Sequence, residues 1–288
     1  MAAEGRGETP DGEDSELVFV RDLALRAGAV CLGWFRGEYT VHDKGGQPVT
    51  VADEQSNELI VSELRRRFPG DEILAEETPV RDERWRSAER CWVVDPLDGT
   101  SDFVKGREGF AVMIGLLVHG RPQLGVVHVP KAGRTFLGQV GEGAWEERGA
   151  QPGAAPGERR PLRCSSRALT SELRVIASIA HRDERLEAAL AALAPQQTLS
   201  VGSVGYKVGK IAADEADLYL AITPSIHLWD TAGPEAILLA AGGAMLDLDG
   251  APLSYSGPHL NHRRGLLATN GACTPAVVGT LQGMFPTL

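Results

Sequence analysis

The sequence has little cysteine, no long apolar run and no surplus of positive charge. Its cysteines are scattered, without the paired spacing of a disulfide framework or a zinc site. They are Cys31, Cys91, Cys164 and Cys273. This usage indicates buried free thiols in a reducing compartment, so we expect a cytoplasmic protein. No apolar run is long enough to span a bilayer, so no transmembrane segment is expected.

Acidic residues outnumber basic ones by 39 to 29, and the formal net charge is −10. No basic stripe offsets this charge, which disfavours binding to a nucleic acid polymer. A small phosphorylated substrate stays compatible with it if metal ions neutralise an acidic site. Residues 1–14 are rich in Gly, Glu and Asp and lack the basic and apolar blocks of a signal peptide. We expect them to form a disordered acidic leader.

Hydrophobic patterning predicts an N-terminal α+β half over residues 15–147. Helices are expected over 17–35, capped by Ser15, and from Asp53 to residue 68, with a polar loop over 44–50 between them. Apolar strands ending near Glu76 and Asp95 should follow. Three further strands, over 110–118, 123–129 and 134–139, should form an antiparallel meander.

Residues 148–160 are rich in Gly, Pro and Ala and are the best candidate for a boundary. In the C-terminal half, 161–288, strands alternate with helices, which favours a more parallel sheet. Strands are expected over 173–179, 198–201, 216–222, 244–248 and 265–269, and helices over 183–193, 203–213 and 230–241. The chain is therefore predicted to be a layered α+β and α/β sandwich, with an antiparallel sheet in the first half and a smaller mixed sheet in the second.

The most informative segment is Asp95-Pro96-Leu97-Asp98-Gly99-Thr100, at the end of an apolar strand. Asp95, the Leu97 carbonyl and Asp98 offer three oxygens from one tight turn, and Mg²⁺ prefers oxygen ligands. A helix that begins just after this turn would point its first amides at an anion. The segment predicts a metal site beside a phosphate site, and its plain alternative is a strand-turn with two solvated aspartates.

Two other acidic segments favour the metal site. Glu76 and Glu77 end a short strand, and Asp230 opens an apolar helix directly after Trp229. Alone, the glutamates would be a solvated strand end and Asp230 an N-cap. Together and in this order, the segments resemble those of the magnesium-dependent, lithium-sensitive phosphatases. These include inositol monophosphatases, 3′(2′),5′-bisphosphate nucleotidases and fructose bisphosphatases.

The resemblance runs from about residue 17 to the C-terminus and implies the sugar-phosphatase (inositol monophosphatase-like) fold, with the site where the halves meet. It implies two or three Mg²⁺ ions per site, an arrangement that can hold a nucleophilic water and a phosphoryl group together. By resemblance, Glu76, Asp95 and the Leu97 carbonyl hold the activating ion. Asp95, Asp98 and Asp230 hold the second ion.

The resemblance also implies the remaining catalytic residues. Thr100 and Asp53 would relay a proton from the attacking water, with Glu76 completing the catalytic set. A plain helix N-cap is the alternative role for Asp53. Lys44 would lie near the metals or be a solvated loop lysine, and Glu77 would orient a water or face solvent.

The substrate is a narrower inference. Inositol monophosphatases typically carry a glutamate after the strand that begins near Asp217, and no glutamate occurs between Asp217 and Asp230. The segment of Gly202, Ser203 and Lys207 and the helix after Trp229 resemble those of the nucleotidases instead. Lys207 could pair with a second, uncleaved phosphate, and its alternative is an exposed helix lysine. The expected substrate contacts are Leu97, Asp98, Gly99, Thr100, Gly202, Ser203, Lys207 and Asp230.

The favoured hypothesis is a Mg²⁺-dependent phosphatase that converts 3′-phosphoadenosine 5′-phosphate to AMP and phosphate, in the recycling that follows sulfate activation. The enzymatic alternative is an inositol-1-monophosphatase or a broad sugar phosphatase. A non-catalytic metal-binding regulatory protein is disfavoured because every expected ligand is present. Glu235 and Tyr255 are expected to be structural, and His227 receives no role. A homodimer is common in such families, but no segment here identifies an interface.

Overall fold

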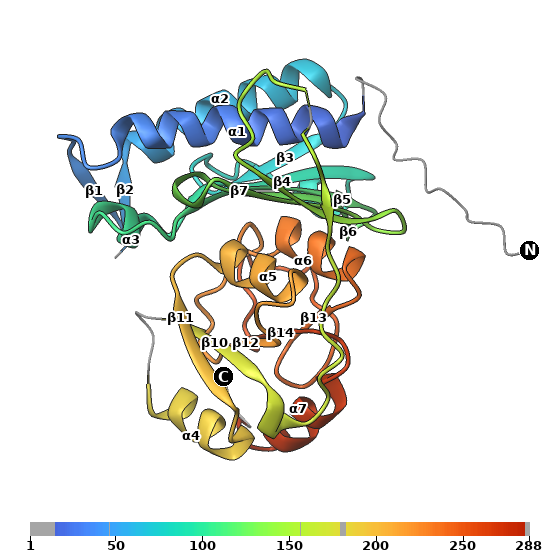
Figure 1. Cartoon of the computed structure of the whole chain (residues 1–288). Coiled ribbons are helices and arrows are strands. Elements are labelled where there is room, and N and C mark those ends of the chain that lie inside the picture. The colour runs from blue at the N-terminus through green and yellow to red at the C-terminus, as the bar shows by residue number, and fades with distance from the viewer. Residues whose placement is uncertain (1–14, 46, 156, 179–182, 286–288) are drawn as a thin grey trace, which may run out of the picture.

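The computed structural model describes residues 15–45, 47–155, 157–178 and 183–285, so the expected leader over 1–14 lies outside the described residues. Five layers are stacked in the molecule: helices α1 and α2, a large sheet, helices α5 and α6, a smaller sheet, and helices α4 and α7 (Figure 1). The layered α+β sandwich predicted from the sequence is confirmed. Within the described ranges, no helix is long and apolar enough to cross a membrane.

The first layer consists of α1 (Glu16–Trp34) and α2 (Val51–Arg67). Ser15 caps α1 as predicted, because its side chain accepts a hydrogen bond from the Val18 amide. The prediction that Asp53 opens α2 is wrong. Thr50 is the N-cap, and Asp53 is the third helical residue, whose carboxylate accepts from the Thr50 amide in a capping box.

The polar loop expected over 44–50 is also wrong, because this segment belongs to a hairpin. Strands β1 (Val41–Lys44) and β2 (Gln47–Thr50) pair antiparallel. Gly45 has a φ of 66°, which a tight hairpin turn requires and which glycine adopts without strain. Each strand has four residues and mostly polar or proline positions, with Val41 in β1 and Val49 in β2, so neither carries an alternating apolar pattern that would indicate a strand.

The large sheet has seven strands in the order β3-β4-β5-β6-β7-β8-β9. Only β3 and β4 run parallel to each other. Strands β5, β6 and β7 form the antiparallel meander that was predicted, and β8 and β9, which were not predicted, extend it. The helix layer of α1 and α2 covers one face, and its apolar side chains share a core with those of β4, β5 and β6. The strands are β3 (Glu72–Ala75), β4 (Arg90–Asp98), β5 (Ala111–Val118), β6 (Arg121–Val129), β7 (Arg134–Gln139), β8 (Gly143–Arg148) and β9 (Arg160–Pro161).

The smaller sheet has five strands in the order β11-β10-β12-β14-β13. Its first three strands run parallel to one another, β14 runs antiparallel to β12, and β13 runs antiparallel to β14, which makes the sheet mixed, as predicted. The strands are β10 (Arg174–Ser178), β11 (Gln197–Val201), β12 (Leu218–Ala221), β13 (Ala244–Leu246) and β14 (Leu266–Thr269).

The helices of this half are α4 (Glu184–Leu193), α5 (Val204–Ala212), α6 (Ala232–Ala240) and α7 (Thr274–Leu281). The prediction that Asp230 opens α6 is one residue early, because Thr231 is the N-cap. Helix α7 was not predicted. Short 3₁₀ turns occur at Arg84–Arg86, Pro130–Ala132 and Thr170–Glu172.

Helix α6 lies on the large sheet at backbone contact. A Cβ added to Gly115 would lie 2.4 Å from the backbone nitrogen of Gly233, and a Cβ added to Gly125 would lie 2.0 Å from the Gly233 carbonyl oxygen. A Cβ added to Gly138 would lie 2.4 Å from the Cα of Ile237. These three glycines lie on β5, β6 and β7. Their lack of a side chain lets the helix rest on the strands, which brings the start of α6 close to the end of β4.

Candidate active site

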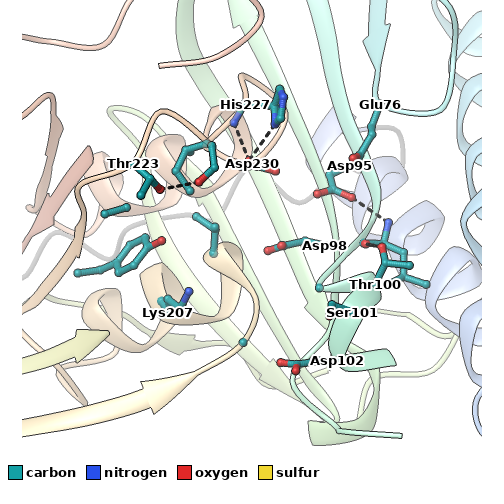
Figure 2. Close-up of a pocket in the computed structure, with 18 of the residues that line it drawn as sticks. Glu76, Asp95, Asp98, Thr100, Ser101, Asp102, Lys207, Thr223, His227 and Asp230 are labelled. Carbon is teal, nitrogen blue, oxygen red and sulfur yellow. Dashed lines mark hydrogen bonds and ion pairs between the residues drawn. The ribbon is translucent and has the colours of Figure 1, made fainter. Parts of the chain in front are cut away.

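A cavity of about 340 Å³ opens where the large sheet meets the C-terminal half (Figure 2). It lies at the ends of β3, β4 and β12, at the start of α3 (Thr100–Val104), and along α5. Its polar lining includes Glu76, Asp95, Asp98, Thr100, Ser101, Asp102, Lys207, Thr223, His227 and Asp230. The two halves of the chain thus contribute different walls to one site.

A β-bulge near the end of β4 orients the two aspartates of the central motif. Asp95 is opposite Met113 and Asp98 is opposite Ala111, so β4 has one residue more than β5 between these pairs. In a regular strand, side chains three positions apart face opposite sides of the sheet. The bulge removes this alternation, and both carboxylates line the cavity.

Three of the predicted metal ligands converge. Asp95, Asp98 and Asp230 each offer a carboxylate oxygen, and these oxygens all lie within 4.8 Å of one another. Burial raises the pKa of all three carboxyls, and neighbouring carboxylates raise those of Asp95 and Asp230 further. Glu76 lines the same cavity, and burial together with the charge of Glu77 raises its pKa to about 7.

The donor set fits a hard divalent cation. The cluster offers carboxylate oxygens, and the cavity lining also includes Leu97, whose carbonyl was predicted as a ligand. No thiolate or imidazole belongs to the cluster among the described residues. An all-oxygen set of this kind suits Mg²⁺ better than a softer transition metal. A bound cation would also offset the mutual repulsion that the raised pKa values reflect.

Residues at the start of α5 donate hydrogen bonds to the Asp98 carboxylate. Its Oδ2 accepts from Ser203 Oγ at 2.5 Å and from the Gly205 amide at 3.1 Å. Ser203 is fully buried and is the N-cap of α5. The sequence had suggested that Ser203 contacts the substrate, whereas in the structure its hydroxyl contacts Asp98. Asp98 also contributes a carboxylate oxygen to the cluster with Asp95 and Asp230.

The two residues of the predicted proton relay are in contact. Thr100 Oγ1 lies 2.9 Å from Asp53 Oδ1 and 3.0 Å from the Leu97 carbonyl oxygen. Asp53 Oδ2 accepts from the amide and the hydroxyl of Thr50, at 2.8 and 2.7 Å. Asp53 is therefore not the plain N-cap that the sequence left open, since it lies at the third helical residue of the capping box, from where it also contacts Thr100. Gly99, with a φ of 92°, is the N-cap of α3 and lines the cavity.

Lys207 is not an exposed helix lysine, since its side chain is 2% exposed. Its Nζ lies 4.5 Å from the centre of the Tyr219 ring, and burial lowers its pKa to about 8 against the attraction of Asp98 and Asp102. Gly202 also lines the cavity. An added Cβ there would lie 2.0 Å from Asp102 Oδ2, so a larger residue would displace the Asp102 side chain, which also lines the cavity.

The β1–β2 hairpin reaches the site through Lys44. Its Nζ donates to the Glu76 carbonyl oxygen at 2.8 Å and to Glu77 Oε2 at 2.9 Å. Lys44 is therefore near the acidic cluster although its side chain is 55% exposed. Glu77 is ion-paired with this lysine and is not simply a solvated strand end.

Sequence reasoning gave no role to His227, which the structure places in the site. The His227 amide donates to Asp230 Oδ2 at 2.6 Å, and its ring stacks on that of Trp229 with the ring centres 4.8 Å apart. Its spacing of three residues before Asp230 was the available signal. As expected, Tyr255 is buried in the core, where its hydroxyl donates to Glu235.

The apolar wall of the cavity was also missed. Leu186 from α4, Ile222 after β12, and Ile226 before α6 line it together with Tyr219. These residues are far apart in the sequence and each has the hydrophobic pattern of ordinary core. No local signal separates them from residues that only pack.

Comparison with known proteins agrees with this geometry. The model of the inositol monophosphatase family matches residues 13–283. The 3′(2′),5′-bisphosphate nucleotidase CysQ of Escherichia coli K12 is 34% identical over 240 residues, covering 82% of this chain and 92% of that protein. Inositol monophosphatase 2 of Mus musculus is 31% identical over 249 residues, covering 80% and 79%.

A solved structure extends the similarity to the fold. The inositol monophosphatase from Anabaena is 28% identical, with a TM-score of 0.72 over 92% of this chain and 94% of that one. The family model spans nearly all of the described residues, including every carboxylate of the acidic cluster. The chain belongs to the inositol monophosphatase family of phosphatases.

Proposed function

We propose that this chain is a Mg²⁺-dependent phosphatase that removes the 3′-phosphate of 3′-phosphoadenosine 5′-phosphate. One observation carries the proposal. An all-oxygen acidic cluster and a buried lysine ammonium line the same cavity (Figure 2). The Lys207 ammonium makes no hydrogen bond or ion pair with the described residues, apart from its contact with the Tyr219 ring. Such a site suits a substrate with one phosphate at the metals and a second phosphate beyond them.

Two cations would be held by Glu76, Asp95 and the Leu97 carbonyl, and by Asp95, Asp98 and Asp230. When bound, they supply an activated water and neutralise the phosphoryl oxygens. Thr100 Oγ1 would take the proton of the attacking water while its own proton passes to Asp53 Oδ1, 2.9 Å away. Burial raises the pKa of Asp53, which makes this carboxylate a better proton acceptor.

The apolar part of the cavity lining supports a nucleotide over an inositol. Leu186, Ile222 and Ile226 present aliphatic side chains to the cavity beside the Tyr219 ring. A nucleobase can bury its flat face against such a surface. The hydroxyl groups of inositol would lose their hydrogen bonds to water there. Lys207 would then hold the 5′-phosphate, and Gly202 would leave room for it.

The second candidate is an inositol-1-monophosphatase or a broad sugar phosphatase. It is favoured by the 31% identity to inositol monophosphatase 2 of Mus musculus and by the likeness to the Anabaena enzyme. Both candidates use the same acidic cluster and differ only in what binds the leaving group.

The test is phosphate release with Mg²⁺ from 3′-phosphoadenosine 5′-phosphate and inositol 1-phosphate, side by side. We expect a strong preference for the nucleotide and inhibition by lithium at the second cation site. Equal or better turnover of inositol 1-phosphate would overturn the nucleotide assignment and leave the phosphatase chemistry standing. Insensitivity to high millimolar lithium would place the enzyme in a resistant subgroup.

We extend the proposal to the setting of the enzyme. Residues 15–147 and 161–288 would act as two intimate halves that share one site. All four cysteines are free and three of them are buried, which supports a cytoplasmic location. The net charge of −10 supports a small phosphorylated substrate over a nucleic acid polymer. A homodimer that recycles nucleotide in sulfur metabolism completes the proposal.

A further inference from the structure

The carbonyl oxygen of Pro96 points away from the cavity, into the layer of α1 and α2. Ser56 Oγ, on α2, donates to it at 2.9 Å, and Cys31 Sγ, on α1, donates to it at 3.8 Å. Both side chains are fully buried. Two helices that supply no predicted metal ligand thus contact the peptide unit between Asp95 and Asp98.

The bulge explains why this carbonyl needs donors from outside the sheet. Pro96 and Leu97 lie in the irregular part of the β4–β5 pairing, where the register shifts. A buried carbonyl without a donor costs free energy. The other polar groups of the bulge have contacts close by in the sequence, since Asp95 Oδ1 accepts from the Leu97 amide at 2.9 Å and the Leu97 carbonyl oxygen lies 3.0 Å from Thr100 Oγ1. The donors to the Pro96 carbonyl are Ser56 and Cys31.

Helix α2 therefore holds the ligand-bearing segment at two points. Asp53 contacts Thr100, just after the bulge, and Ser56 contacts Pro96, within it. Residues three apart on a helix lie on the same face, so one rigid face of α2 makes both contacts. The Asp53 contact belongs to the proposed reaction, whereas the Ser56 contact touches neither substrate nor cation.

We propose that Ser56 is a positioning residue that sets the cation affinity of the acidic cluster by holding the Pro96 carbonyl, with Cys31 as a weaker second donor. The inference rests on the proposed function, because it concerns the same cluster. The peptide unit of Pro96 directly precedes Leu97, so its orientation fixes where the Leu97 carbonyl and the two flanking carboxylates converge. Burial raises the pKa of the Cys31 thiol to about 12, so its proton stays on sulfur and can be donated.

The experiment is a Mg²⁺ titration of the purified full chain by calorimetry, with the thermal unfolding midpoint in EDTA measured in parallel. Removing a group that orients a metal ligand typically weakens metal binding by about 10–100-fold. We expect Ser56→Ala to raise the Mg²⁺ dissociation constant about tenfold and Cys31→Ala to raise it by less. Ser62→Ala is the matched control on the same helix, because its exposed hydroxyl bonds only to the Leu59 carbonyl, and its Mg²⁺ affinity should equal that of the wild type.

A Ser56→Ala protein with an unchanged Mg²⁺ dissociation constant and a lower midpoint in EDTA would overturn the positioning role and leave a structural one. If that variant does not fold, Ser56→Cys replaces it, and its thiol should give a dissociation constant above that of the wild type. An unchanged constant in Ser56→Cys would then overturn the positioning role. A wild-type chain that binds no Mg²⁺ would overturn the proposed cation site itself, and this result is distinct from the others.

Discussion

Each aspartate of the cluster has one oxygen fixed by a neighbouring donor. Asp95 accepts from the Leu97 amide, Asp98 from the Ser203 hydroxyl, and Asp230 from the His227 amide. These bonds stabilise three charges in a small buried volume where they repel one another. The arrangement is unfavourable without a cation and favourable with one, because a divalent ion replaces repulsion with attraction.

Asp98→Asn removes one of these charges and keeps the shape of the side chain. We expect turnover to fall by at least about a hundredfold because the second cation loses a ligand, a loss comparable to that of a metal-orienting group. The fold should remain, since an amide oxygen can still accept from Ser203 and Gly205. Steady-state kinetics with saturating Mg²⁺ and circular dichroism check both parts. Activity near that of the wild type would show that the ligand assignment is wrong.

Lys207 should make binding of a bisphosphate depend on pH. Its pKa is lowered to about 8 by burial, so the ammonium loses its proton above that pH and with it the attraction for a second phosphate. We expect the KM for 3′-phosphoadenosine 5′-phosphate to rise above pH 8 in the wild type. Lys207→Met should have a higher KM at neutral pH and no further rise, and Lys210→Met, a variant of a neighbouring partly buried lysine, should behave as the wild type. A rise of equal size in both the wild type and Lys207→Met would exclude Lys207 as its source.

At the scale of elements, the apolar strands and the longer helices could be predicted in order, whereas β1, β2, β8, β9, α7 and most element ends could not. The apolar strands and the helix after Ser15 have strong periodic patterns, which single out elements reliably. The residue at which a helix begins is harder to predict, because Thr50 and Asp53 both carry side-chain acceptors that can bond to the first amides of the helix. Helix Thr274–Leu281 was missed because its β-branched residues and single glycine have weak helix propensity, and packing against the C-terminal core stabilises it.

The contact between α6 and the large sheet gives a prediction at this scale. Gly125→Ala would place a Cβ against the Gly233 carbonyl oxygen, at a backbone position that cannot rotate away. We expect a loss of stability of about 1–3 kcal/mol, typical of overpacking, together with weaker Mg²⁺ binding as the start of α6 shifts. Gly279→Ala is the control. It has open space around it and lies within a helix, so it should stabilise the chain by about 0.5–1 kcal/mol. Denaturant unfolding with and without Mg²⁺ measures both.

At the scale of the whole molecule, the acidic residues that line the cavity could be predicted from the sequence and its apolar wall could not. The acidic segments carry residue types that are rare in apolar surroundings, so each is visible on its own. Leu186 and Ile222 reach the cavity, and Ser56 reaches the Pro96 carbonyl, only through tertiary contacts. A leucine in a cavity wall and a serine within a helix have the same local pattern as any other, so nothing in the sequence separates them from packing residues.

The acidic cluster should also set the stability of the whole chain. The pKa of Glu76 is raised to about 7 in the folded state, above the ordinary value of 4.5. Its contribution to stability is therefore fully present below about pH 4.5 and is lost as pH rises toward 7. In EDTA we expect the free energy of unfolding to fall over this range by on the order of 1–3 kcal/mol, since each pKa unit corresponds to about 1.4 kcal/mol. Glu76→Gln should flatten this dependence.

Saturating Mg²⁺ should reverse the trend, because the cation competes with protons for the same oxygens. At a Mg²⁺ concentration of about a hundred times the dissociation constant, binding adds about 2.7 kcal/mol to the stability of the folded state. The gain in melting temperature should therefore be larger at pH 8 than at pH 5. An equal gain at both pH values would show that Mg²⁺ binds outside the acidic cluster. Thermal unfolding in paired EDTA and Mg²⁺ buffers measures the difference.

Because of the bulge at Pro96 and Leu97, the side of the sheet that each of the two aspartates faces depends on the number of residues in β4 and β5. Side chains alternate along a strand, so one residue inserted between Ala111 and Met113 would let β4 pair regularly with β5 and turn one of the two aspartates toward the helices. If the inserted residue is uncharged, the lengthened chain would keep both carboxylates and the same net charge. A single added codon in β5 would thus disrupt the acidic cluster without removing any of its residues.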